Sequence, residues 1–376
     1  MTVQPLGSKF IHALPFWSSI ALAPVTIFTM YQGGFWFVIP VLLIWYGVTM
    51  VDEITGQYKK NADPDTSEDA LFWYKAVTIV WPFVQFAVIF WAIYFISRSD
   101  YALWEKLGIA LNIGMLTGTI GINYAHELMH QKDKRERFLA DFLLAMGLYS
   151  HFRSEHLQVH HRYVGTPKDP VTARFGESFY KYFRRVLTSC PQSAFRAEKE
   201  KLAKVGKPWT DRSNPFFTYA ALQIGLLVLT FLIGGWAGIL FFVAQAFVAI
   251  THLELVDYVE HYGLTRKHLG NGKYEHVQPH HSWNAEHRGS NWILINLQRH
   301  SDHHYKPNRR FPVLQTYGAE IAPQLPYGYP LMTLAALFPR LWRKKMNPRV
   351  RRWRDMYYPE ITDWLPYNKG RTPMPR

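Results

Sequence analysis

The chain has little cysteine, and charged residues are absent from several of its long stretches. Cys190 is the single cysteine among 376 residues, which excludes a disulfide framework, a zinc ribbon and a cysteine-ligated iron–sulfur site within this chain. The sequence also has no Gly-rich turn of the kind that binds dinucleotides. The N-terminus lacks a basic segment followed by a short apolar segment and a cleavage site, so we expect no cleavable signal peptide. Any electrons that such a chain uses have to come from a separate carrier.

Uncharged apolar stretches of membrane-spanning length recur along the chain. A helix needs about 20 mostly apolar residues to cross a bilayer, and such stretches occur at 11–31, 34–51, 76–96 and 107–125. A further stretch, 214–253, has about twice the length that one crossing requires. It has to turn at Gly234-Gly235, which divides it into spans at 214–233 and 236–253. We therefore predict an all-α polytopic membrane protein with six transmembrane helices.

The polar segments between the spans are predicted to form a histidine-rich cap. The cap comprises residues 126–213 and 254–358, and with the spans it forms a single integral-membrane domain over 1–376, with a C-terminal tail or linker at 359–376. Of the 42 Lys and Arg residues, 16 lie in 131–210 and 19 in 257–376. The positive-inside rule assigns these regions and, with an even number of spans, both termini to the cytosol. The net charge of +14 therefore fits an anionic membrane face or an acidic protein partner better than nucleic acid.

Nine of the 17 histidines lie in four groups at spacings typical of metal ligands. The groups are His126 and His130; His156, His160 and His161; His261; and His300, His303 and His304. A spacing of four puts two imidazoles on one helix face, which suits a shared metal, whereas adjacent histidines point about 100° apart, which suits two neighbouring metals. Nine imidazoles exceed the roughly six positions of one octahedral ion, so we predict two metals with open positions. Imidazole suits Fe, Zn, Cu and Ni alike, so the histidines alone leave the metal open.

The remaining histidines have ordinary explanations. We interpret His12, His151, His252 and His268 as residues of the surface or of the membrane boundary. The run 275–287 also contains several histidines, and we interpret it as support for the ligands or as surface.

Four sequence elements around these histidines resemble those of a known family. They are His126–His130 (HELMH), Glu155–His161 (EHLQVHH), Leu297–His304 (LQRHSDHH) and Glu260–Gly263 (EHYG). With them, nearly the whole chain resembles the integral-membrane alkane 1-monooxygenases, the AlkB-type alkane hydroxylases. That family belongs to the membrane non-haem di-iron superfamily, which includes fatty acyl desaturases and hydroxylases.

The resemblance implies a specific enzyme. Two iron ions would be held by His126, His130, His156, His160, His161, His261, His300, His303 and His304. With O2 and two electrons they would convert a medium-chain n-alkane from the bilayer to the 1-alkanol. The family takes its electrons from rubredoxin, supplied by a flavin-dependent, NADH-using rubredoxin reductase, and we expect a location in the bacterial inner membrane.

Further residues are candidates for supporting roles. Carboxylates beside the histidines could accept the far N–H of an imidazole; these are Glu127, Glu155, Glu260 and Asp302. Asp169 could do the same, or it could form a turn before Pro170. An apolar tunnel for the alkane could be lined by Trp45, Phe83, Phe86 and Leu116, although Trp45 could equally pack against another helix or lipid. A docking surface for an acidic electron donor, or a membrane anchor, could be formed by Arg343, Lys344, Lys345, Arg351, Arg352 and Arg354.

Three other functions are compatible with parts of the sequence. An acyl-lipid desaturase or hydroxylase would keep the fold and change the substrate. The segment His126–His130 also matches the HExxH motif of zinc proteases, but that reading leaves six histidines without a role. A metal transporter would need ionisable groups near the middle of the bilayer, whereas these spans are uncharged.

Overall fold

The computed structural model describes residues 3–4 and 6–368. Within these residues, five helical segments are long and apolar enough to cross a membrane. The first four are α1–η1–α2 (Phe10–Trp17, Ser18–Ala21, Leu22–Gln32), η2–α3–η3–α4 (Gly34–Phe37, Val38–Leu42, Leu43–Gly47, Val48–Thr55), α5 (Phe72–Ile96) and α6–η4–α7 (Leu103–Leu116, Thr117–Ile122, Asn123–Met129). The fifth is α12 (Pro215–His261). The predicted helical membrane fold is confirmed.

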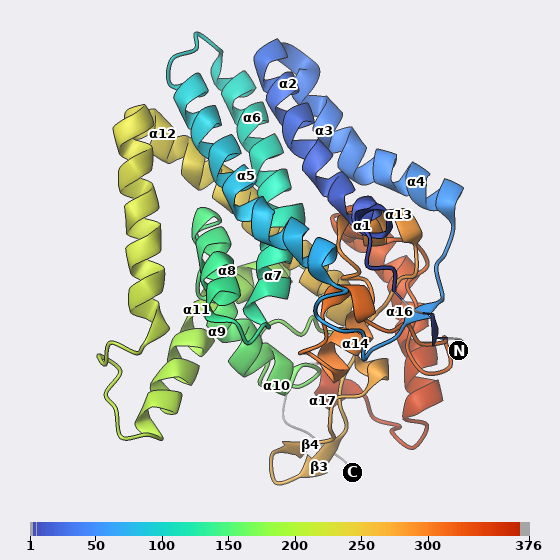
Figure 1. The fold of residues 1–376 in the computed structure, drawn as a ribbon. Helices are drawn as coiled ribbons and strands as arrows, with labels where there is room; N and C mark the ends of the chain where they lie inside the picture. The colour runs from blue at the N-terminus through green and yellow to red at the C-terminus, as the bar shows by residue number, and fades with distance from the viewer. Residues whose placement is uncertain (1–2, 5, 369–376) are drawn as a thin grey trace.

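The longest helix, α12, changes direction at Gly235. This glycine has φ 58° and ψ −149° inside a run of 47 residues. Residues other than glycine rarely adopt this backbone conformation. Figure 1 shows the two arms of α12 diverging from the bend, one of them passing behind α5 and α6. The bend lies at the expected turn, and each arm has about the length of one crossing. The count of six crossings remains a prediction.

Small residues hold the second arm of α12 close to the α6–η4 segment. A Cβ atom added at Gly114 would lie 2.5 Å from the Gln245 carbonyl oxygen, and one added at Gly118 would lie 2.9 Å from that of Ala249. Two glycines four residues apart allow two membrane helices to approach in this way. The contact packs α12 against the segment that continues into α7, which carries His126 and ends just before His130.

The cap is built from shorter elements on one side of the long helices. Its helices are α8 (Lys134–Met146), α9 (Phe152–Glu155), η5 (His156–His160), α10 (His161–Tyr163), α11 (Phe179–Ala203), η6 (Pro279–His281), α13 (Arg288–Ile293), α14 (His300–Tyr305), η7 (Phe311–Val313), α15 (Tyr329–Ala336), α16 (Pro339–Tyr357) and α17 (Leu365–Asn368). Two small sheets complete it, a parallel pair of β1 (Val3–Gln4) with β2 (Asn61–Ala62) and an antiparallel pair of β3 (His268–Gly270) with β4 (Lys273–Tyr274). Of the expected tail 359–376, residues 369–376 lie outside the described residues.

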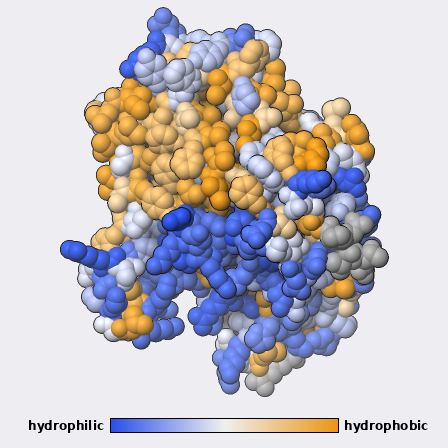
Figure 2. Space-filling view, in the orientation of Figure 1, coloured by the Kyte–Doolittle hydropathy of each residue, from blue (hydrophilic) through white to orange (hydrophobic). Residues whose placement is uncertain are grey.

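The surface separates into an apolar and a polar part. Figure 2 shows hydrophobic side chains gathered over the upper part of the molecule, where the long helices lie, and hydrophilic side chains over the cap. The connector after α4 lies with the cap, because Arg299 donates hydrogen bonds to the carbonyl oxygens of Tyr58 (3.2 Å) and Lys60 (3.0 Å). The protein is therefore a membrane protein whose polar connector and histidine-bearing loops share one face.

Candidate metal centre

The structure brings the nine predicted histidines together in two adjacent groups. The first consists of His126, His130, His156, His161 and His303, and the second of His160, His261, His300 and His304. Within each group the potential ligand atoms lie within 4.8 Å of one another. The groups adjoin each other, since the rings of His161 and His304 are 4.5 Å apart.

The ring nitrogens converge in a way that hydrogen bonding alone does not satisfy. The Nε2 atom of His156 lies 3.0 Å from that of His126, 3.1 Å from that of His130 and 2.9 Å from that of His161. A neutral imidazole has one N–H donor and one acceptor nitrogen, so one Nε2 atom cannot be hydrogen-bonded to all three. In the second group, His300 Nε2 lies 3.1 Å from His261 Nε2 and 2.9 Å from His304 Nε2. Lone pairs aimed at a common point fit a bound cation.

Burial keeps these imidazoles in the form that binds metals. Desolvation, with a smaller contribution from His160, lowers the pKa of His130 to about 3. The pKa values of His161 and His304 are also lowered well below the usual value, again mainly by burial. Neutral imidazole is the common protein ligand of transition metals. The donor set therefore fits a metal centre.

The π-helical turn η5 determines how the second histidine motif is divided. His156 and His160 are four residues apart, and the spacing predicts one shared face, yet they lie in different groups. In η5 the wider turn pairs residues five apart, so His156 faces His161 at 2.9 Å. The spacing rule does hold for His126 on α7 and His130 at the C-terminal cap of that helix.

Adjacent histidines are separated as their directions predict. His160 and His161 belong to different groups, and so do His303 and His304 on α14. The third pair with a spacing of four, His300 and His304, shares the second group.

Two of the five candidate carboxylates contact a histidine of the groups. Asp169 Oδ2 lies 3.0 Å from His160 Nδ1, and Glu260 Oε1 lies 3.3 Å from His300 Nδ1. Asp169 also makes the expected turn, because its Oδ1 accepts from the Val171 N–H at 3.0 Å. Both proposed roles of Asp169 are thus compatible.

The other three carboxylates have different surroundings. Asp302 accepts from Arg309 Nη1 at 2.7 and 2.6 Å and from Tyr317 Oη at 2.6 Å. Glu127 accepts from Gln131 Nε2 at 3.1 Å. Glu155 is fully buried with no hydrogen-bond partner among the described residues, and burial, followed by repulsion from Asp169, raises its pKa well above the usual value.

Two acidic residues near the groups were not among the candidates. Asp257 joins Glu260 and His261 in a cluster of ligand atoms within 4.8 Å of one another. Glu254 accepts hydrogen bonds from the hydroxyls of Tyr149 (2.8 Å) and Tyr182 (3.0 Å). Their spacing of three along α12 with Glu260 puts all three near one helix face, and this is the signal that could have identified them.

Two small cavities extend from the histidines toward the N-terminal helices. The inner cavity, about 30 Å³, is lined by His126, His300, Asp257 and Glu260 among others. The outer cavity, about 20 Å³, is lined by Trp45, Tyr329 and Pro330 among others. They share Thr119, His252, Val256 and Leu294 as wall residues. The two cavities therefore adjoin along this shared wall, and we refer to the pair as the channel below.

Of the four residues predicted for a tunnel, Trp45 lines the channel and three do not. Phe83 is 61% exposed on the outside of α5. Phe86 packs against Phe90 and Phe142, with ring centroids 4.5 and 5.7 Å away. Leu116 is buried in the apolar core.

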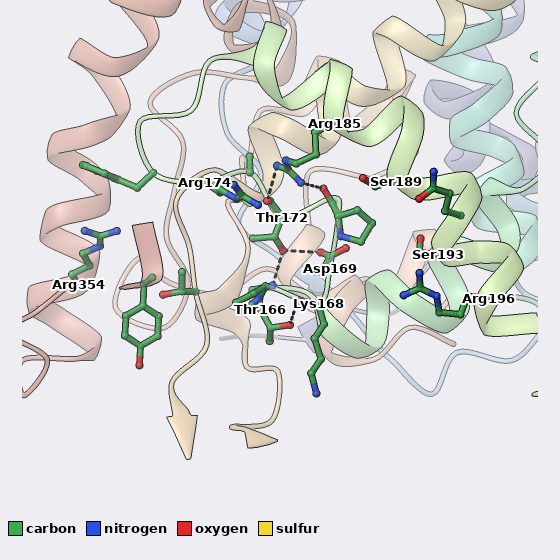
Figure 3. A pocket seen from close by; sticks show the side chains of 18 residues that line it. Thr166, Lys168, Asp169, Thr172, Arg174, Arg185, Ser189, Ser193, Arg196 and Arg354 are labelled. Carbon is green, nitrogen blue, oxygen red and sulfur yellow. Dashed lines mark hydrogen bonds between the residues drawn. The ribbon is translucent and has the colours of Figure 1, made fainter. Parts of the chain in front are cut away.

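A polar pocket of about 300 Å³ is lined in part by Asp169, the residue that contacts His160. Figure 3 shows Arg174 and Arg196 on opposite sides of Asp169. Arg185 is held in place by Glu177, whose carboxylate lies 2.8 Å from its Nη2. Lys168 also lines the pocket.

The basic residues predicted on α16 border this pocket in part. Arg354 is buried in its wall, stacked on the rings of Phe175 and Trp364 at 4.5 and 4.3 Å. Arg351 lies 5.7 Å from the Phe175 ring, and Arg343 donates to the Gly176 carbonyl oxygen at 3.4 Å. Lys344 and Arg352 are exposed, whereas Lys345 lies over the Tyr327 ring at 4.6 Å. We define the basic surface as Lys168, Arg174, Arg196, Arg343 and Arg351.

The histidines of the 275–287 run form a separate cluster around Tyr358. The ligand atoms of Glu275, His280 and His281 lie close together, but His281 Nδ1 accepts from the Gln278 N–H at 2.8 Å. Neutral His281 therefore carries its proton on Nε2, which lies 2.7 Å from Tyr358 Oη. This arrangement satisfies hydrogen bonds, and it fits the interpretation of the run as structural support.

The expectation that four single histidines lie at the surface or the membrane boundary is wrong for His252 and His268, which are both buried. His252 is 8% exposed and forms part of the channel wall. His268 is also 8% exposed, packed against the Tyr274 ring at 5.0 Å.

Comparison with known proteins gives the class and then the family. Residues 102–335 match the family model described as fatty acid desaturase. Alkane 1-monooxygenase 2 of Alcanivorax borkumensis is 36% identical over 369 residues, covering 96% of this chain and 94% of that protein. Alkane 1-monooxygenase 2 of Pseudomonas aeruginosa is 37% identical and covers 84% of each chain.

A relative that is named for a different substrate is more distant. The xylene/toluene monooxygenase hydroxylase component XylM of Pseudomonas putida is 31% identical over 261 residues, 67% of each chain.

The chain belongs to the AlkB-type alkane monooxygenase family within the membrane superfamily of the fatty acid desaturases. It is therefore an oxidoreductase of the monooxygenase class.

Proposed function

We propose that the protein hydroxylates the terminal carbon of medium-chain n-alkanes, using O2 and two electrons, at a centre of two iron ions. The observation that carries this proposal is the position of the two histidine groups at the inner end of the channel. Relatives named alkane 1-monooxygenase support the substrate class.

The nine histidines would hold the ions, five in the first group and four in the second. When bound, the two iron ions supply the activation of O2 that removal of an unactivated C–H bond requires. The residues of this chain position the substrate and exclude water. Asp169 orients the imidazole of His160 by accepting at Nδ1, which leaves Nε2 free to bind a metal. Glu260 lies close enough to His300 Nδ1, at 3.3 Å, to stabilise the same tautomer by its charge.

Substrate selection would depend on the shape of the channel. An alkane has no polar group for recognition, so binding comes from burial of its surface, at about 0.8 kcal/mol for each CH2 group. Val256 and Leu294 form apolar walls in the middle of the channel, and Trp45 lies in its outer part. A terminal methyl group entering from the side of Trp45 would reach the histidines first.

The electron donor would be rubredoxin, reduced in turn by rubredoxin reductase, and we propose that it docks on the basic surface. The pocket lined by Asp169 brings the outside of the cap to within one side chain of His160. Arg174, Arg196 and Arg351 are exposed around it, and an acidic carrier would be steered there by charge. This arrangement requires the cap to face the cytosol of a bacterium, with the chain in the inner membrane and both termini on the cytosolic side.

Docking can be tested by the rate at which reduced rubredoxin reduces the iron-loaded protein. Arg196→Gln combined with Arg351→Gln should slow this step severalfold at low ionic strength, and added salt should remove most of the difference. Arg98→Gln is the matched control, because Arg98 lies beside the bend of α12, where it donates to the Ile233 carbonyl oxygen. Equal rates for all three proteins at every salt concentration would contradict docking at the basic surface.

The substrate proposal is tested by product analysis. Iron-loaded protein in lipid nanodiscs, supplied with rubredoxin, its reductase, NADH and n-octane, should form 1-octanol. An acyl-lipid desaturase would leave octane unchanged and introduce a double bond into an acyl chain. Formation of the second product alone would replace alkane hydroxylation by desaturation.

A further inference from the structure

Two polar residues, Thr119 and His252, lie in the wall where the two cavities of the channel adjoin. Both residues line the inner and the outer cavity. The other two residues shared by the cavities, Val256 and Leu294, are apolar. Anything that passes between Trp45 and the histidine groups by this route therefore passes the His252 imidazole.

The imidazole of His252 has an unused hydrogen-bonding atom. Its Nδ1 lies 3.5 Å from Thr119 Oγ1, the outer limit of a hydrogen bond. Its Nε2 is buried and has no partner among the described residues. A buried polar atom without a partner destabilises a fold, and a leucine would fill this position without that cost. The Nε2 atom is therefore available for a hydrogen bond to a molecule inside the channel.

The distance of His252 from the metal centre determines how long a molecule must be to contact both. His252 precedes His261 by nine residues on the same arm of α12, which corresponds to about 13 Å along the helix axis. A medium-chain molecule of about this length, with its methyl end at the metal centre, would thus reach His252. A polar atom at its other end could then lie near Nε2.

We infer that His252, oriented by Thr119, is a binding site for the hydroxyl group of a medium-chain 1-alkanol. This inference rests on the proposed function, because it assigns a second substrate class to the same centre. A hydroxyl is both a donor and an acceptor, so it matches either tautomer of the imidazole. With its hydroxyl at His252, the alkanol presents its far methyl group to the histidine groups.

The resulting reaction has the same balance as alkane hydroxylation. The far C–H bond of the alkanol is replaced by C–OH with one oxygen atom of O2. The other oxygen atom leaves as water, formed with two protons and two electrons from the same donor. The product is an α,ω-diol.

The test compares alkanols with alkanes in the wild type and in His252→Leu. The substrates are n-decane and the 1-alkanols from 1-octanol to 1-hexadecanol, and the readout is the ratio of kcat/KM for diol formation to kcat/KM for decane hydroxylation. One neutral hydrogen bond corresponds to about a three- to tenfold fall of this ratio in His252→Leu. The fall should be largest at one chain length, since the hydroxyl has to reach Nε2.

Two further variants make the result specific. His252→Gln, which keeps a donor and an acceptor, should restore part of the ratio. His151→Leu is the matched control, because His151 Nε2 is also buried without a partner among the described residues but lies beside Tyr149, outside the channel. If His252→Leu does not fold, Thr119→Val takes its place and should lower the ratio in the same direction.

A binding measurement separates this inference from the proposed function. Scintillation proximity with tritiated 1-decanol should show weaker binding to metal-free His252→Leu than to metal-free wild type. If the wild type binds 1-decanol more tightly than His252→Leu does but fails to hydroxylate decane, the proposed function alone is overturned. Decane hydroxylation with equal alkanol-to-alkane ratios in wild type and His252→Leu would overturn the inference alone.

Discussion

The hydrogen bond between Asp169 and His160 makes a specific prediction for Asp169→Asn. The two side chains are almost completely buried, with exposed fractions of 0% and 1%, and Oδ2 lies 3.0 Å from Nδ1. A carboxylate there can only accept, so the ring proton stays on Nδ1 and Nε2 stays free for a metal. An asparagine with its amide nitrogen in the place of Oδ2 would reverse this preference and move the proton to Nε2.

The other orientation of the asparagine keeps an oxygen toward His160 and the Thr172 hydroxyl, which donates to Oδ2 at 2.6 Å, but it loses the contact at Oδ1. Oδ1 of Asp169 accepts from the Val171 N–H at 3.0 Å, so turning the amide toward that group would place two donors against each other. Loss of such a supporting contact lowers metal affinity about 10- to 100-fold, which corresponds to roughly 1.4 to 2.8 kcal/mol. We expect Asp169→Asn to lower the affinity for iron by about 10- to 100-fold and to lower octane turnover as well.

The assay is iron binding to metal-free protein in competition with a chelator, together with octane turnover at saturating iron. Asp141→Asn is the matched control, because Asp141 is also buried, with its carboxylate 2.6 Å from Arg153 Nε, and contacts no histidine of the two groups. Folded Asp169→Asn protein that binds iron as tightly as the wild type would refute the reasoning about the tautomer.

Four further changes probe other parts of the molecule. His261→Ala removes one of four imidazoles of the second group and should abolish octane turnover and lower the iron content of membrane-inserted protein; full activity would remove His261 from the ligand set. Trp45→Ser enlarges the outer cavity and should extend the alkanes accepted, as gas chromatography of the products will reveal; an unchanged profile would place the end of the channel elsewhere. Neutralising Arg351 and Arg352 together should slow turnover with rubredoxin at low salt, whereas turnover insensitive to both salt and charge would assign this stretch to membrane anchoring. Arg310→Ala should lower the unfolding free energy by about 3 kcal/mol in denaturant titrations, since the guanidinium pairs with two carboxylates; a loss near zero would contradict that pairing.

The convergence of the histidines could be predicted from the sequence because it follows from the order of the membrane spans and the spacing of the histidines. His126 and His130 follow a span directly, and the later groups lie in segments on the same side of the membrane. The division of the motif His156–His161 could not be predicted. It depends on the π-helical turn η5, and the residues there would fit an α-helix as well.

The walls of the channel were harder to predict, for a reason particular to membrane proteins. In α5, residues that face lipid and residues that face other helices are both apolar, so no periodic pattern separates them. Phe83 on the lipid-facing side and Trp45 in the channel therefore look alike in the sequence. The burial of His252 cannot be predicted from the sequence, because a single histidine carries no spacing signal and its surroundings depend on which residues of other helices lie opposite it.

The most direct test of the account is a titration of metal-free protein with Fe(II), in which 1-octanol formation from octane is measured at each ratio of iron to chain. Nine imidazoles in two groups predict that activity rises until about two iron ions are bound per chain and then stays constant. Activity that is complete with one ion per chain, or that zinc restores equally well, would contradict a two-iron centre.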